Sequence, residues 1–248
     1  MCMKGETFIT ICAASYKAAE WRFIMEKKIL SREELQEALL SRCTREETEK
    51  LSRSRVAVAG LGGLGSHTAV FLARAGIGHL HLIDFDKVDI TNLNRQHYFI
   101  PHLGRYKTEA LKEQLLQINP WMDIETSCEE VREENIQKLF KEADIICEAF
   151  DRPENKAMLV NGCLEIFPEK ILVCASGMAG WGKSNDIITR KVGKNFYLCG
   201  DGISGIEKGH GLVAPRVALC AAHEANLIVE LILKNCTKQR KEVTENER

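Results

Sequence analysis

The sequence predicts a doubly wound α/β fold, in which helices cover both faces of a mostly parallel sheet. Three observations predict it: short apolar runs alternate with helical stretches over residues 55–175, a glycine-rich turn directly follows the first run, and an aspartate ends the second. This alternation favours βαβ units with right-handed crossovers. The chain has 248 residues, 45% hydrophobic and 28% charged, which is enough for one such domain with a substantial core.

The expected elements follow one another through short connections. The strands of the parallel series are expected at 56–60, 79–84, around 124, 144–150 and 171–175, and the helices at 64–75, 107–118, 133–141 and 154–167. After Gly177 the sequence is rich in glycine and predicts an antiparallel hairpin extension with strands at 187–191 and 196–199. A largely apolar helix from about Ala214 to Lys234 closes the fold, and its composition indicates burial in the core or at a subunit interface.

The ends of the chain differ from this main domain, which we place at residues 55–235. Residues 1–24 share no pattern with the rest and are interpreted as a dispensable extension. Residues 25–54 are expected to form a short N-terminal helical appendage, because Ser31 with Glu34 and Thr44 with Glu47 both fit the capping box. Residues 236–248 are polar and are expected to form a flexible tail.

Composition argues against several classes of protein. The 34 basic and 35 acidic residues give a formal charge of −1, which argues against a nucleic-acid partner. No apolar run is long enough for a membrane-spanning helix, so no membrane partner is expected. The ten cysteines contain no C-x-x-C pair, so we expect reduced thiols, a cytoplasmic protein and no zinc site.

The glycine-rich turn carries the first chemical signal. Gly60, Gly62 and Gly65 form G-x-G-x-x-G between a strand and a helix, and Asp84 lies 19 residues beyond Gly65 at the end of the next strand. Such glycines let a phosphate approach backbone amides at a helix N-terminus, and the aspartate can accept hydrogen bonds from ribose hydroxyls. By itself this motif leaves open whether the ligand is a nicotinamide dinucleotide or ATP.

The polar segment after Asp84 favours a triphosphate. A nicotinamide ring needs a flat apolar slot, whereas a triphosphate needs cations and hydrogen-bond donors. The polar residues that follow are Asp86, Asn92, Asn94, Arg95, Gln96 and Lys107. A solvated polar loop is the alternative, but these residues follow a strand end where open α/β sheets bind ligands.

Together these motifs resemble the superfamily of ubiquitin-like-protein activating enzymes, which includes the bacterial ThiF and molybdopterin-synthase adenylyltransferases. The shared residues are Gly-Leu-Gly-Gly-Leu-Gly-Ser at 60–66, Asp84 and Asp86, Asn-Leu-Asn-Arg-Gln at 92–96, Lys107, Asn119-Pro120 and Asp151. The segments Gly-Met-Ala-Gly at 177–180 and Gly-Leu-Val-Ala-Pro-Arg at 211–216 look most like a compact ThiF branch. Members of that branch activate the sulfur carrier ThiS of thiazole synthesis in thiamine biosynthesis.

The resemblance implies a doubly wound Rossmann-like adenylyltransferase that uses ATP and Mg²⁺. It would form an acyl-adenylate on the C-terminal Gly-Gly carboxylate of a ThiS-like carrier and act as a homodimer. Arg95, Lys107 and Asp151 would be catalytic, and Asp151 would also bind the metal ion. The remaining nucleotide-binding residues would be Gly60, Gly62, Gly63, Gly65, Asp84, Asp86, Asn92, Asn94 and Gln96. For Asp86, both a magnesium role and a loop-stabilising role remain open.

The sequence also departs from this family. Many relatives carry two C-x-x-C pairs for zinc, and this chain has neither. Cys199 falls where relatives place a zinc-binding or reactive cysteine, and both a reactive thiol and a plain buried thiol are possible. Relatives supply an arginine from the neighbouring subunit, for which Arg42 and Arg45 are candidates. Three other functions remain open: a dehydratase of a modified tRNA adenosine, an NAD(P)-dependent oxidoreductase and a non-catalytic carrier-binding scaffold.

Overall fold

The computed structural model describes residues 30–205 and 211–246, with side chains up to residue 234. Contacts divide the chain into residues 1–35 and 36–248. In the first unit, Ser31 and Glu34 form the predicted capping box through hydrogen bonds of 2.8 and 3.1 Å. The predicted extension, residues 1–24, lies outside the described residues.

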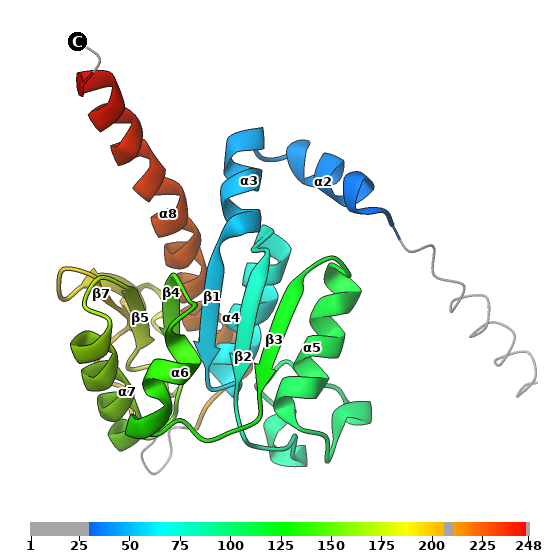
Figure 1. Cartoon of the computed structure of the whole chain (residues 1–248). Coiled ribbons are helices and arrows are strands. Elements are labelled where there is room, and N and C mark those ends of the chain that lie inside the picture. The colour runs from blue at the N-terminus through cyan, green and yellow to red at the C-terminus, as the bar shows by residue number, and fades with distance from the viewer. Residues whose placement is uncertain (1–29, 206–210, 247–248) are drawn as a thin grey trace, which may run out of the picture. The chain divides into compact units, whose positions relative to one another are not determined.

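A seven-stranded sheet forms the centre of the second unit and confirms the predicted α/β fold (Figure 1). Its strand order is β3-β2-β1-β4-β5-β7-β6. The bounds are β1 Arg55–Ala59, β2 His79–Ile83, β3 Asp123–Ser127, β4 Ile145–Glu148, β5 Ile171–Ala175, β6 Ile188–Lys191 and β7 Phe196–Gly200. All neighbouring strands are parallel except β6 and β7, which form the predicted antiparallel hairpin. The second strand of that hairpin, β7, pairs with β5.

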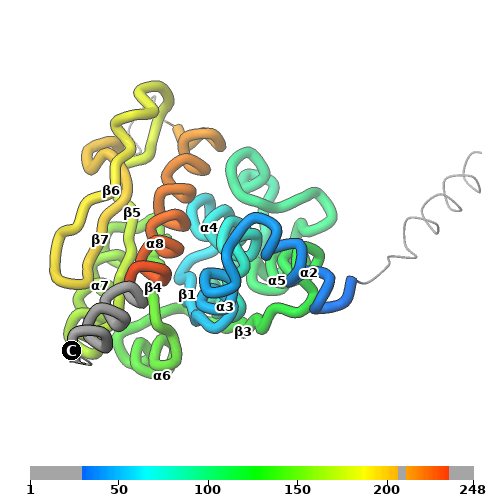
Figure 2. Tube along the Cα trace, turned by 90° about the horizontal axis from the view of Figure 1, so that it is seen from above, coloured from blue at the N-terminus to red at the C-terminus, as the bar shows by residue number. Residues whose placement is uncertain are grey.

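Helices cover both faces of the sheet, as a doubly wound fold requires. The bounds are α2 Arg32–Leu40, α3 Arg45–Arg53, α4 Gly63–Ala75, α5 Lys107–Ile118, α6 Ile136–Phe140, α7 Pro153–Ile166 and α8 Ala214–Asn246. One core cluster joins α4, α5 and α8 to one face, and a second joins α6 and α7 to the other (Figures 1 and 2). Alternate residues of β1 enter the two clusters: Val56 and Val58 the first, Ala57 and Ala59 the second.

Two helices differ from the prediction. Over the segment expected to be helical at 133–141, a 3₁₀ turn occupies Glu133–Asn135 and α6 begins only at Ile136. The Asn135 carboxamide oxygen accepts a hydrogen bond from the Arg132 N–H at 2.8 Å and so caps the start of the 3₁₀ turn. The last helix continues beyond Lys234 to Asn246. The flexibility expected for residues 236–248 stays a prediction.

The second N-terminal helix and the last helix both pack into the main unit. The capping box that begins α3 joins Thr44 and Glu47 as predicted, and Leu51 of α3 is buried in the first core cluster. The buried face of α8 packs against α4 and the sheet, and carries Val217, Cys220, Ala221, Glu224, Ala225, Leu227, Ile228 and Leu231. Within the described residues, no helix has the length and apolarity needed to cross a membrane.

Candidate functional site

The glycine-rich turn lies at the carboxyl end of β1, directly before α4. Gly60 has a φ of +90°, and an added Cβ would lie 2.9 Å from the Ala149 carbonyl oxygen. On Gly65, an added Cβ would lie 1.8 Å from the Gly60 carbonyl oxygen. Both positions therefore require glycine. Gly62 is the N-cap of α4 and has no side chain to bind the first helical N–H groups. These groups are suited to bind an anion such as a phosphate.

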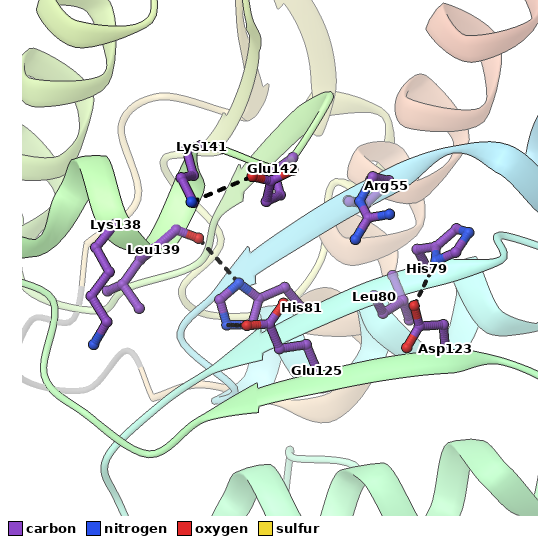
Figure 3. A pocket seen from close by; sticks show the side chains of 12 residues that line it. Arg55, His79, Leu80, His81, Asp123, Glu125, Lys138, Leu139, Lys141 and Glu142 are labelled. Atoms are coloured by element: carbon purple, nitrogen blue, oxygen red, sulfur yellow. Dashed lines mark hydrogen bonds and ion pairs between the residues drawn. The ribbon is translucent and has the colours of Figure 1, made fainter.

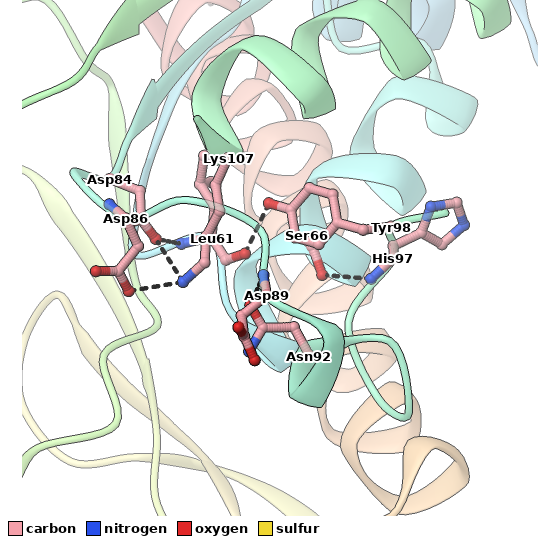
Figure 4. Close-up of polar contacts among 9 residues, drawn as sticks. All are labelled: Leu61, Ser66, Asp84, Asp86, Asp89, Asn92, His97, Tyr98 and Lys107. Atoms are coloured by element: carbon pink, nitrogen blue, oxygen red, sulfur yellow. Dashed lines mark hydrogen bonds and ion pairs between the residues drawn. The ribbon is translucent and has the colours of Figure 1, made fainter. Parts of the chain in front are cut away.

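Asp84, immediately after β2, fastens this turn through its carboxylate (Figure 4). Its Oδ2 accepts a hydrogen bond from the Leu61 N–H at 2.7 Å, and its Oδ1 accepts one from the Asp86 N–H at 2.8 Å. Burial raises the pKa of Asp84, while the positive charge of Lys107 opposes that shift. The carboxylate thus shapes the site itself, in addition to the ribose contact predicted from its position.

Two further hydrogen bonds tie the turn to the segment after β2. The Tyr98 hydroxyl donates to the Leu61 carbonyl oxygen at 2.9 Å, and the His97 N–H donates to Ser66 Oγ at 3.0 Å. Tyr98 is buried, and burial raises the pKa of its hydroxyl, which therefore stays protonated as a donor. Both the N–H and the carbonyl of Leu61 are thus fixed by side chains of one neighbouring segment.

Lys107, the first residue of α5, is buried between two carboxylates. Its Nζ lies 2.8 Å from Asp86 Oδ2 and 3.8 Å from Asp84 Oδ2. Asp86 remains half exposed, so it holds Lys107 from the solvent side. This contact agrees with a loop-stabilising role for Asp86, and the magnesium role stays a prediction. The two carboxylates thus hold the cation at the carboxyl ends of the strands.

The structure brings Arg95 and Gln96 to the N-terminus of α4. An added Cβ on Gly63 would lie 3.8 Å from Arg95 Cγ, and one on Gly62 would lie 3.9 Å from Gln96 Nε2. Gln96 is buried, and its Oε1 has no hydrogen-bond partner in the described part of the chain. Arg95 Nη1 donates to the Thr91 carbonyl oxygen at 3.0 Å, which leaves its other nitrogens for a ligand.

The two asparagines of this segment have mainly local contacts. Asn92 Oδ1 accepts a hydrogen bond from the Asp89 N–H at 3.0 Å and so caps a 3₁₀ turn. Asn94 Oδ1 accepts from Arg95 Nη1 at 2.9 Å, and its Nδ2 donates to the Leu212 carbonyl oxygen at 3.5 Å. Asn94 therefore orients Arg95 and connects it to the chain just before α8.

Asp151 follows β4 with an exposed side chain. The turn that carries it lies against the glycine turn, because a Cβ on Gly60 would lie 3.0 Å from Phe150 Cδ1. Glu148 fixes this turn: its Oε1 accepts hydrogen bonds from the Phe150 N–H at 2.7 Å and from Lys156 Nζ at 3.0 Å. Burial raises the pKa of Glu148, and Lys156 opposes that shift.

Sequence reasoning missed Glu148 and Lys156, together with three buried polar residues farther along the chain. The signal for the first pair was a carboxylate at a strand end with a lysine eight residues later. Glu224 is buried in α8 and accepts a hydrogen bond from Thr68 Oγ1 at 3.0 Å. The other two, Asp201 and Arg216, form a buried ion pair. Arg216 ends the motif at 211–216, but Asp201 and Glu224 belong to none of the motifs identified in the sequence.

Cys199 is a plain buried thiol in this structure. It is fully buried, and burial raises its pKa to about 12. Because the thiolate is the nucleophilic form, this environment is unsuited to a reactive cysteine. The candidate arginines Arg42 and Arg45 are both exposed, and their predicted contact with a neighbouring subunit stays a prediction.

Possible metal ligands are sparse in the described ranges, 30–205 and 211–234, which contain no cluster of three or more His, Cys, Asp or Glu side chains suited to a metal ion. A magnesium ion bound with a nucleotide needs less, because substrate phosphates and waters supply most of its ligands. The exposed carboxylate of Asp151 and the half-exposed carboxylate of Asp86 provide oxygen atoms of the right kind.

A pocket of about 110 Å³ lies at the opposite end of the strands (Figure 3). It is lined by the first residues of β1, β2 and β3, which are Arg55, His79 and Asp123. His79 Nδ1 lies 2.9 Å from Asp123 Oδ2, and His81 Nε2 lies 3.9 Å from Glu125 Oε1. Ligands of open α/β sheets bind at the carboxyl ends of strands, so we place the candidate site at the glycine turn.

Known proteins resemble this chain over most of its length. The model of the ThiF family matches residues 35–247. Molybdopterin-synthase adenylyltransferase of Haemophilus influenzae is 39% identical over 116 residues, which cover 46% of this chain and 48% of the relative. The tRNA threonylcarbamoyladenosine dehydratase of Bacillus subtilis is 37% identical over 123 residues, 49% of this chain and 48% of the relative. The chain thus spans about half the length of these curated relatives.

A solved structure shares the fold. The tRNA N6-threonylcarbamoyladenosine dehydratase of Escherichia coli, crystallised in complex with ATP, superposes with a TM-score of 0.77 and 21% sequence identity. The superposition covers 85% of this chain and 99% of that one. The predicted Rossmann-like architecture is therefore confirmed by a known structure.

Proposed function

The chain belongs to the ThiF family, and we propose that it is an ATP-dependent adenylyltransferase acting on the C-terminal glycine carboxylate of a ThiS-like sulfur-carrier protein. In this reaction a carboxylate oxygen attacks the α-phosphorus of ATP and forms a new oxygen–phosphorus bond. The bond between the α- and β-phosphates breaks, and its electron pair leaves with pyrophosphate. The products are a carrier acyl-adenylate and pyrophosphate.

The observation that carries this proposal is the convergence of anion-binding groups at one place. The N-terminus of α4, Arg95 and Lys107 all lie at the carboxyl ends of β1 and β2. The reaction brings a carboxylate to a triphosphate, so the site must supply positive charge and alignment. An E. coli protein with the same fold was solved with ATP, which supports ATP as the nucleotide.

Each residue then has a defined task. Lys107 and Arg95 bind phosphate oxygens and stabilise the charge that develops on pyrophosphate. Gln96 contacts the phosphates, and Asp84 binds the ribose while it keeps the glycine turn in place. Asp151 would hold Mg²⁺, and Asp86 would be a second candidate ligand. The ion would neutralise phosphate oxygens, as magnesium does in nucleotide-dependent enzymes.

Pyrophosphate release tests the proposal. Purified protein is incubated with ATP, Mg²⁺ and recombinant ThiS, and the matched control is ThiS that lacks its last glycine. We expect release only with intact ThiS and with Mg²⁺, and its loss in Arg95→Ala and Asp151→Ala. Release that does not depend on the final glycine would refute the carrier assignment. An active Asp151→Ala would refute the metal role.

A second candidate is a dehydratase that activates the carboxylate of threonylcarbamoyladenosine in tRNA. It is favoured by the match to the Bacillus subtilis dehydratase and by the near-complete coverage of the E. coli structure. The near-neutral charge of the chain argues against a tRNA substrate. Offering ThiS and the modified tRNA in parallel reactions distinguishes the two, since each function predicts ATP consumption with one substrate only.

A further proposal concerns the assembly of the protein. We propose a homodimer in which Arg42 or Arg45 reaches the neighbouring active site, so that replacing the responsible arginine would lower activity without changing ATP affinity.

An NAD(P)-dependent oxidoreductase is an alternative class of enzyme, but it would leave Arg95 and Lys107 without a task. Fluorescence of bound NADH, compared with thermal protection by ATP, separates these two classes.

A further inference from the structure

Arg216 lies in the first turn of α8 and joins segments that are far apart in the sequence. Its Nη2 donates a hydrogen bond to Asp201 Oδ2 at 2.6 Å, and its Nη1 donates to the Gly182 carbonyl oxygen at 2.6 Å. The Arg216 and Asp201 side chains are only 8% and 7% exposed. Nearby, the Gly180 N–H donates to the Gly211 carbonyl oxygen at 2.8 Å. The start of α8 is thus tied to the loop after β5 and to the segment after β7.

Asp201 organises the segment after β7 by itself. Its Oδ1 accepts hydrogen bonds from the N–H groups of Ile203 and Ser204 at 2.9 and 2.8 Å, and its Oδ2 accepts one from Ser204 Oγ at 2.6 Å. Burial alone would raise the pKa of Asp201, but these bonds and the one from Arg216 lower it to about 2. The Asp201 carboxylate therefore carries a negative charge at neutral pH.

This assembly borders the candidate site. Asn94, in the polar segment after β2, donates a hydrogen bond to the Leu212 carbonyl oxygen at 3.5 Å. Val217 of α8 packs against the glycine turn so closely that a Cβ on Gly63 would lie 2.8 Å from Val217 Cγ1. Residues 211–217 thus lie between the glycine turn and the two segments held by Arg216.

An arginine is required for this geometry. The planar guanidinium group donates in two directions at once, to a carboxylate and to a backbone carbonyl, whereas a lysine is a single point charge. A buried ion pair adds little net stability compared with apolar residues of the same volume, and its best-supported use is to fix one arrangement. The contacts of Arg216 fix the relative positions of the segments that carry Gly182 and Asp201.

We propose that Arg216 and Asp201 are positioning residues that fix the side of the site from which the carboxylate of the second substrate approaches the nucleotide. This inference rests on the proposed function. The nucleotide side is held separately, by the bonds of Asp84 and Tyr98 to the glycine turn. Loss of the Arg216–Asp201 contact therefore weakens binding of the second substrate and leaves ATP binding intact.

The experiment uses the full chain with ATP and recombinant ThiS. Arg216→Lys keeps the charge but loses one of the two contacts, and Asp201→Asn offers a second variant should the first fail to fold. The matched control is Arg132→Met, which removes an exposed ion pair of the same 2.6 Å length with Glu130. We expect the KM for ThiS to rise about tenfold in Arg216→Lys and Asp201→Asn. The KM for ATP and thermal protection by ATP should stay unchanged.

Hydrogen–deuterium exchange provides the readout that does not depend on turnover. In Arg216→Lys we expect faster exchange in residues 177–183 and 201–204 and unchanged exchange in the glycine turn. An equal rise of both KM values would overturn the proposal, because it indicates a general structural role. Unchanged KM for ThiS with unchanged exchange would overturn it as well. If the wild-type protein does not act on ThiS, the carrier assignment fails. The positioning role is then decided by two other measurements, which are hydrogen–deuterium exchange in the Arg216→Lys variant and its thermal protection by ATP.

Discussion

Two neighbouring regions at the carboxyl edge of the sheet are held together in different ways. The glycine-turn region, residues 60–66 and 84–107, is cross-bonded by several buried side chains. Asp84 and Tyr98 fix the backbone of Leu61 from both sides. These bonds within the protein fix the backbone of the turn that we propose binds the nucleotide.

In the Arg216 region, residues 177–183, 201–204 and 211–217, backbone hydrogen bonds and one buried ion pair, that of Arg216 with Asp201, join the segments. Both regions leave large apolar side chains in solvent: Trp181 is 81% and Ile203 is 88% exposed here, and Ile90 is 69% and Ile100 is 73% exposed in the glycine-turn region. Single exposed apolar side chains are common on protein surfaces, and a contact between Trp181 and the carrier is a prediction. The difference teaches that several side-chain bonds fix the glycine turn, whereas the Arg216 region relies on one buried ion pair and on backbone hydrogen bonds.

The largest effect is expected in the glycine turn. In Gly65→Ala the new Cβ would meet the Gly60 carbonyl oxygen at 1.8 Å, so the backbone must move and ATP affinity should fall by roughly 100-fold or more. Isothermal titration of ATP measures this. The control is Gly193→Ala in the β6–β7 hairpin, where the nearest atom is 3.4 Å away. Normal ATP affinity in Gly65→Ala would show that the turn is less constrained than its contacts indicate.

Lys107→Met should have the next largest effect. It removes the cation that lies between Asp84 and Asp86, so pyrophosphate release should fall by roughly 10²–10³-fold, as is typical when one charge-stabilising group is lost. Lys112→Met is the control on the same helix, since Lys112 Nζ bonds only a backbone carbonyl, that of Ile124. Near-normal turnover in Lys107→Met would remove this lysine from the catalytic set.

Glu224 of α8 accepts a hydrogen bond from Thr68 of α4, and so joins the two helices that begin in these two regions. Burial raises its pKa from 4.5 to about 8, and Lys156 and Glu148 are the charged groups that influence it. Below pH 4.5 the folded and unfolded chains both keep the proton. Between pH 4.5 and 8 the unfolded chain loses it first, so stability is lost as pH rises through this range.

Glu224→Gln removes that penalty. The variant should therefore gain up to about 3 kcal/mol of unfolding free energy at pH 7 and almost none at pH 4.5. Urea unfolding at the two pH values measures the difference, and Glu230→Gln on the exposed side of α8 serves as control. A gain that is equal at both pH values would contradict the buried, protonated state of Glu224.

The smallest effect on stability is expected at the exposed surface of the Arg216 region. Trp181→Ala should change the free energy of unfolding by less than about 0.5 kcal/mol, because the side chain is mostly in solvent. ATP affinity should be unchanged, while the KM for ThiS should rise several-fold. Trp121→Ala, a half-exposed tryptophan between α5 and β3, is the matched control. Equal KM values in both variants would show that Trp181 contacts no partner.

The fold was largely predictable because the periodicity of the chain is regular. Strands such as β5 are continuous apolar runs, and the start of α4 is marked by glycines whose spacing reflects backbone geometry. The predicted start of α6 at residue 133 was wrong, because the sequence pattern does not distinguish the 3₁₀ turn at Glu133–Asn135 from the first turn of an α-helix. The predicted end of α8 near Lys234 was wrong, because the polar residues that follow continue the helix to Asn246.

The candidate site was predictable only where it forms a motif. Residues 84–107 are polar at set spacings after a strand, so their gathering at one edge could be expected. The sequence did not predict that the Asp84 carboxylate also holds the Leu61 N–H, because this hydrogen bond joins residues that lie 23 positions apart. Arg216 was noticed as part of a motif, but its contact with Asp201 requires knowledge of how β7 and α8 pack. No pattern in the sequence indicates such a pair.

The adenylyl transfer itself is the claim on which this account depends, and intact mass spectrometry of ThiS after incubation with the protein, ATP and Mg²⁺ tests it most directly. We predict a gain equal to one adenylyl group on intact ThiS and no gain on ThiS without its final glycine. ATP consumption with no change in the mass of ThiS, or an adenylyl group on the truncated carrier, would contradict the account.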